Sequence, residues 1–152
     1  MYIWLLQLHS ILRWVILILL LLAVFRALTA GSRPFNSTDK KMGLFTLIAS
    51  DLTLLVGLYQ WFVGPYGFNA IKNMGMSTVM KAPDQRFFAV EHITGMIIAI
   101  ILVHIGRSYA KKKLPDTTKH KKTLLFFGLA LLIILISIPW PFRIAGAGRG
   151  WF

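Results

Sequence analysis

The sequence has 152 residues, of which 57% are hydrophobic and 14% are charged, with a formal net charge of +12. Its mean hydropathy of +0.68 is well above that of a water-soluble globular domain of this size. Because the chain has no cysteine, disulfides, thiolate metal sites, cysteine-ligated iron–sulfur clusters and covalent haem attachment through CxxCH are excluded.

Four apolar segments are long enough to cross a bilayer as helices, because the hydrocarbon core is about 30 Å thick and a helix rises about 1.5 Å per residue. They cover residues 3–28, 44–63, 87–107 and 124–142. We interpret the first as a retained helix, since no basic region precedes it. The stretch 68–82 is too short and too polar to cross, and it is typical of an interfacial helix or an ordered loop. The sequence therefore predicts an all-α fold, a four-helix bundle forming one transmembrane domain over residues 1–152.

The positions of lysine and arginine predict the orientation of these helices. Eleven basic residues flank the first and third connections, namely Arg26, Arg33, Lys40, Lys41, Arg107, Lys111, Lys112, Lys113, Lys119, Lys121 and Lys122. Only five lie in the second connection and the C-terminal tail. Since basic connections stay in the cytoplasm, we expect both termini on the periplasmic side of a bacterial inner membrane. The basic residues would contact anionic membrane lipids, and we expect no nucleic-acid partner.

Ionisable side chains within membrane helices are costly and therefore mark candidate sites. His9 and His92 lie at nearly the same depth, about 9 Å and about 7 Å from the outer ends of their helices. Two imidazoles at one height on different helices are able to hold a haem from both faces, although each could instead only bond a neighbouring helix. Gly95 and Ala99 would leave a groove for the flat ring, or serve ordinary helix packing.

Other charged residues have predicted partners as well. Arg86 and Arg143 are expected where a haem would meet water, and are candidates to bind its two carboxylates. Arg13 and Asp51 lie at similar heights on antiparallel helices, which predicts a buried ion pair, with a proton relay as the alternative.

Three further ionisable residues lie in or near the third and fourth segments. Glu91 is either placed by the helix dipole or a candidate proton acceptor from a quinol. We expect His104 to be an inner-side hydrogen-bonding residue, because it does not share a helix face with His92. We expect His120 to lie in a solvated loop among lysines.

Several motifs suggest a family. They are Leu8-His9-Ser10 with Leu12-Arg13-Trp14, Arg86-Phe87-Phe88-Ala89-Val90-Glu91-His92, Ile105-Gly106-Arg107, Ile138-Pro139-Trp140-Pro141-Phe142 and Gly148-Arg149-Gly150-Trp151-Phe152. Together they resemble the small bacterial four-helix membrane proteins labelled cytochrome B or cytochrome b-like, over essentially the whole chain. The resemblance implies a haem b-associated electron-transfer protein of the inner membrane, with His9 and His92 in the matching histidine-bearing segments.

The leading interpretation is one non-covalent haem b between the first and third helices, exchanging electrons with a quinone or a partner redox protein. We expect an electron carrier or subunit rather than a stand-alone enzyme. The alternative is a non-catalytic membrane subunit or interaction module of a larger respiratory or secretion complex, without haem. A third interpretation is a small proton or ion conductor that uses Arg13, Asp51 and Glu91.

Overall fold

The regular structure is entirely helical within residues 2–143 and 151, the part of the chain that the computed structural model describes. The elements are α1 (Tyr2–Leu28), α2 (Ser37–Val63), α3 (Phe68–Met74), α4 (Met76–Lys81), α5 (Pro83–Arg86), η1 (Phe87–Glu91), α6 (His92–Tyr109) and α7 (Asp116–Ser137). Four helical stretches in that part are long and apolar enough to span a membrane; they contain α1, α2, the continuous run α5 to α6, and α7. The all-α prediction is confirmed.

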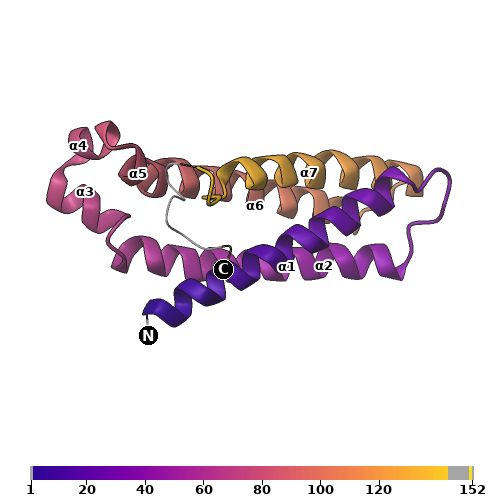
Figure 1. The fold of residues 1–152 in the computed structure, drawn as a ribbon. Coiled ribbons are helices and arrows are strands. Elements are labelled where there is room, and N and C mark those ends of the chain that lie inside the picture. Colours follow the sequence, from indigo (N-terminus) through magenta and orange to yellow (C-terminus); the bar gives the residue numbers. More distant parts are fainter. Residues whose placement is uncertain (1, 144–150, 152) are drawn as a thin grey trace.

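The four long helices lie side by side (Figure 1). α1 packs against α2 and α7, and α6 packs against the same two helices. The shared core includes Leu20, Val103, Phe127 and Ile138, none of which is more than 1% exposed. Leucine, isoleucine and phenylalanine also cover the outward faces of the long helices, as expected for surfaces in contact with lipid.

Several helix boundaries differ from the expected ones, and for two of them the reason is local. α2 begins seven residues earlier than residue 44, because the Asn36 side chain accepts hydrogen bonds from the backbone of Thr38 and Asp39, and the Asp39 carboxylate accepts one from the Asn36 N–H. α7 ends at Ser137 instead of residue 142. Pro139 disfavours the helical conformation of the residue before it, and Ile138 is extended with ψ 134°.

One end of the molecule carries the α1–α2 connection (residues 29–36) and the α6–α7 connection (residues 110–115); we call it the connection end (Figure 1). There Asp39 pairs with Arg26 at 3.0 Å and with Arg33 at 2.8 Å. His120 Nε2 lies 3.1 Å from the Arg33 carbonyl oxygen, and its ring packs against Phe35. The prediction that His120 lies in a solvated loop is wrong, because α7 begins before it and buries it to 3% exposure.

The opposite end is covered by residues 64–82, which contain α3 and α4; we call it the cap end (Figure 1). The expectation of a helix or an ordered loop in residues 68–82 is confirmed as two short helices. Ala70 and Val79 are buried against Ala89, so the segment is anchored to the start of the third long helix. The Trp61 indole N–H donates to the Ala89 carbonyl at 3.0 Å and so joins α2 to the start of the third long helix.

A π-helical turn interrupts the third long helix immediately before His92. The His92 N–H bonds to the Phe87 carbonyl five residues back, instead of the residue four back. Such a turn holds one extra residue and changes the direction in which the preceding side chains point, and π turns are often found at functional sites.

Candidate functional site

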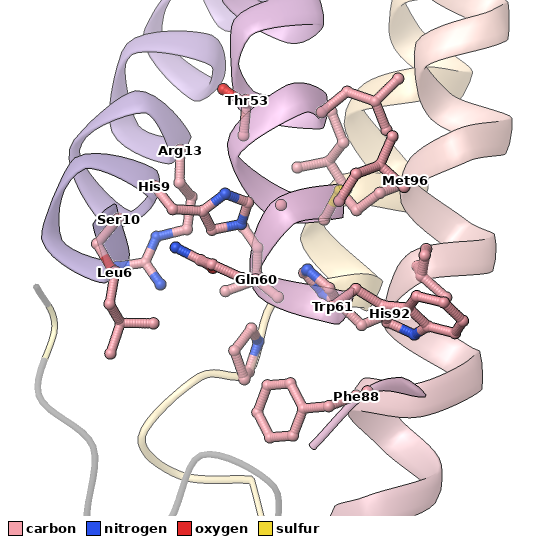
Figure 2. A pocket seen from close by; sticks show the side chains of 18 of the residues that line it. Leu6, His9, Ser10, Arg13, Thr53, Gln60, Trp61, Phe88, His92 and Met96 are labelled. Atoms are coloured by element: carbon pink, nitrogen blue, oxygen red, sulfur yellow. The ribbon is translucent and has the colours of Figure 1, made fainter. Parts of the chain in front are cut away.

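A cavity of about 410 Å³ lies among the long helices in the half nearer the cap end. This volume falls in the range typical of small-molecule sites. In Figure 2, His9 and Arg13 extend into it from α1, Gln60 and Trp61 from α2, and His92 and Met96 from α6. The lining is mostly apolar with a few polar groups, as is usual for cofactor pockets.

The two histidines predicted to act together come together at this cavity. The ring centroids of His9 and His92 are 6.2 Å apart, and the ring planes make an angle of 66°. If both rings ligated one metal atom, each bond would be about 2 Å and each ring centre about 1 Å further, so the centroids would be about 6 Å apart. The observed separation matches the distance expected if both rings held one metal atom, and it also matches ordinary edge contact between two rings.

His92 is oriented by α7. Its Nδ1 lies 2.7 Å from the Ser137 carbonyl oxygen. Because a carbonyl only accepts, the proton resides on Nδ1, and Nε2 of the neutral ring carries the lone pair that a metal requires. A bond of this kind on the far nitrogen is what normally fixes the rotation and tautomer of a metal-bound histidine.

His9 is oriented by α2. A Cβ at Gly57 would lie 3.0 Å from His9 Cε1, so the ring rests directly on the glycine backbone. His9 Nδ1 is buried and makes no hydrogen bond within residues 2–143 and 151. The edge of the ring that carries Cε1 and Nδ1 therefore faces α2, and His9 as a whole lines the cavity.

Gly95 and Ala99 do not form the expected groove. Neither lines the cavity. A Cβ at Gly95 would overlap the Ser137 side chain, and Ala99 is fully buried in the core. The groove prediction is therefore wrong, and the alternative of close helix packing is the correct one. Small residues at these positions let α6 approach α7, with which it has its most extensive contact.

Arg86 and Arg143 do not reach the cavity either. Arg86 pairs with Glu91 at 2.6 Å and also donates to the Met80 carbonyl. The Arg143 guanidinium lies 5.0 Å from the centre of the Phe87 ring and donates to backbone carbonyls at the end of α7. The expectation that both arginines face a haem is corrected accordingly. Glu91, the candidate proton acceptor, is engaged with Arg86 in this structure.

The predicted ion pair between Arg13 and Asp51 is not formed. Arg13 lines the cavity and donates to the Trp151 carbonyl at 2.5 Å. Asp51 Oδ1 instead lies 2.8 Å from His104 Nε2. Arg13 therefore faces the cavity, whereas Asp51 lies on the exposed side of α2. The prediction that His104 forms a hydrogen bond is confirmed.

Sequence reasoning missed the cavity residues on α2, among them Gln60 and Gly57. Gln60 donates to the Leu5 carbonyl at 2.7 Å and lines the cavity, as does Gly57 beneath His9. The available signal was a glycine and an amide one turn apart in an otherwise apolar segment.

A site for a bare metal ion would need more protein ligands than this cavity offers. Within the residues that the structure describes, no group of three or more His, Asp or Glu side chains could hold a metal ion. Two histidines are sufficient only for a metal that brings its other ligands with it, as the iron of a porphyrin does. No protein-family model, curated protein or solved structure matches the chain.

Proposed function

We propose that this protein is a haem b-binding protein of the bacterial inner membrane, in which His9 and His92 would hold the haem iron. The observation that carries the proposal is the 6.2 Å separation of the two imidazole rings beside a cavity of about 410 Å³. The Ser137 carbonyl holds His92 in the tautomer that a ligand needs, and Gly57 makes room for the His9 ring.

Arg13 is the best candidate to neutralise the carboxylates of the haem, because its side chain lines the same cavity. A bound haem would supply reversible one-electron exchange, for which a membrane quinone or a partner redox protein is the proposed partner. The protein's own contribution is to orient the two imidazoles, surround the ring with apolar side chains and exclude water.

The proposed topology is a four-helix bundle with the connection end in the cytoplasm and both termini in the periplasm. The support is the excess of basic residues beside the first and third connections. These two connections lie at the same end of the molecule, where His120 at the start of α7 contacts Arg33. The proposed haem site would then lie in the periplasmic half of the membrane.

The absorption spectrum of the purified protein tests the proposal. The expected result is a Soret band with a sharp α-band on reduction, lost or converted in His9→Ala and His92→Ala. His104→Ala is the matched control, because His104 lies on the same helix as His92 but does not line the cavity. Gly57→Ala should shift the bands without abolishing them, since the added methyl group displaces the His9 ring by a few tenths of an ångström.

A colourless protein that does not take up added haem would overturn the proposal. If that protein also co-purified with large membrane partners, the result would favour the alternative of a non-catalytic subunit.

A further inference from the structure

A second polar site lies on the outer surface of α2 and α6, outside the cavity. It consists of Asp51 near the middle of α2 and His104 more than one turn before the end of α6, joined by the 2.8 Å contact between Oδ1 and Nε2. Their side chains are 43% and 50% exposed. Both helices are long and apolar enough to span a membrane, so this surface would face lipid if the chain were alone.

Lipid is a poor neighbour for such a pair. Ionisable groups within membrane spans almost always face the interior of a bundle or a water-filled cavity, because hydrocarbon offers neither donors nor acceptors. Here one hydrogen bond satisfies only one atom of each residue. Within residues 2–143 and 151, the structure gives neither Asp51 Oδ2 nor His104 Nδ1 a hydrogen-bond partner. These two atoms therefore need hydrogen-bond partners from another chain.

The two remaining atoms complement each other. In an ion pair, the ring holds both of its protons and the carboxylate holds none, so Nδ1–H donates and Oδ2 accepts. If the shared proton instead resides on Oδ1, then Nε2 accepts it, and Nδ1–H still donates and Oδ2 still accepts. In both of these arrangements, which carry no net charge, the pair presents one donor and one acceptor to its surroundings.

This pattern fits a second copy of the same chain. A two-fold axis perpendicular to the membrane preserves height, and it brings residue i of one copy to residue j of the other and the reverse. Asp51 and His104 are at the same height because they bond each other. The donor of each copy is therefore level with the acceptor of the other, and one interface satisfies all four atoms.

The surrounding residues suit such a contact. Leu44, Ile48 and Leu55 extend along the exposed side of α2 on which Asp51 lies. Ile97, Ile101 and Ser108 do the same on α6 around His104. Apolar stripes with a few polar side chains are typical of helix interfaces within membranes.

We propose that the protein forms a two-fold dimer in the membrane through α2 and α6, with Asp51 of each copy bonded to His104 of the other. The proposal requires the helices to lie in a membrane, and it is independent of haem binding.

Cysteine cross-linking in native membranes tests the dimer, because the natural chain has no cysteine. Ile48→Cys places a thiol one turn from Asp51. Ile18→Cys is the matched control, since it is also exposed and lies at a similar distance from the connection end, but on α1. We expect oxidation to join Ile48→Cys chains about tenfold faster or more, because a standing dimer raises the effective concentration of the two thiols.

A double replacement then tests the polar pair itself. Asp51→Leu with His104→Leu removes both ionisable groups from the surface, so cross-linking through position 48 should fall to the rate of the position 18 control. Circular dichroism and gel filtration establish that this variant is folded. Counting photobleaching steps in liposomes gives an independent readout, with two steps expected for the natural surface and one for the double variant.

Equal rates at positions 18 and 48 would overturn the proposal, as would single-step bleaching of the natural protein. Cross-linking of position 48 only to a different membrane protein would also overturn it, because that result would identify another occupant of the surface.

Discussion

Gly106 is a position where one added methyl group should measurably weaken the fold. It lies where α6 meets α7, and a Cβ there would be 2.8 Å from Phe127 Cδ1 and 3.0 Å from Phe126 Cβ. The Phe127 side chain is 1% exposed and part of the core, so its ring cannot turn away into the surroundings without disturbing neighbouring core residues. Overpacking of this kind costs about 1–3 kcal/mol. Alanine offsets up to about 1 kcal/mol of this through its better helix propensity.

We therefore expect Gly106→Ala to lower the free energy of unfolding by about 1–2 kcal/mol. The measurement is an SDS titration of the detergent-solubilised protein, followed by circular dichroism. Gly128→Ala is the control on α7, because a Cβ there would meet nothing within 4 Å. That variant should be neutral or more stable by up to about 1 kcal/mol. Equal changes in the two variants would refute the close packing of α6 on α7 at Gly106.

Asp39→Ala should lower the free energy of unfolding by about 2 kcal/mol in the same titration, because it removes a capping box and two partly exposed ion pairs, whereas alanine at a neighbouring lysine should change little. Double-mutant cycles with leucine should show a coupling free energy of about 0.5–3 kcal/mol between Asp51 and His104. The effects of replacing Asp51 and Arg13 should instead add to within about 0.5 kcal/mol, and the reverse pattern would contradict the observed contacts. A reporter that works only in the cytoplasm should be inactive after Phe152 and active in the connection at residues 110–115, and activity after Phe152 would invert the proposed topology.

Heights along the helices could be predicted from the sequence, but directions around them could not. The rise per residue is constant and hydropathy marks the helix ends, so counting gave His9 and His92 similar depths, and their rings lie 6.2 Å apart. The same counting paired Arg13 with Asp51, which the structure separates. Which way a side chain points depends on how the helices pack, and in the third long helix also on the π turn before His92. No local pattern in the sequence specifies either.

Hydropathy also predicted where the apolar segments lie, but not where the helices that contain them begin. α7 begins at Asp116, well before the apolar stretch, and its polar first turns bury His120 against the α1–α2 connection. The sequence also cannot show what fills the space beside a small residue such as Gly95, since a glycine leaves space equally for a ligand or for another helix. Only the position of α7 identifies Ser137 as the neighbour of Gly95.

The π turn at residues 87–91 changes how related sequences should be aligned with this one. Its extra residue shifts the preceding side chains by about 100° relative to an uninterrupted α-helix. A homologous chain one residue shorter in this stretch would keep His92 facing the cavity with an ordinary helix. Its residues corresponding to Arg86 and the cap end would then approach from a different side. In an alignment, a single-residue gap at this point would therefore indicate a different orientation of the cap end, with the histidine pair unchanged.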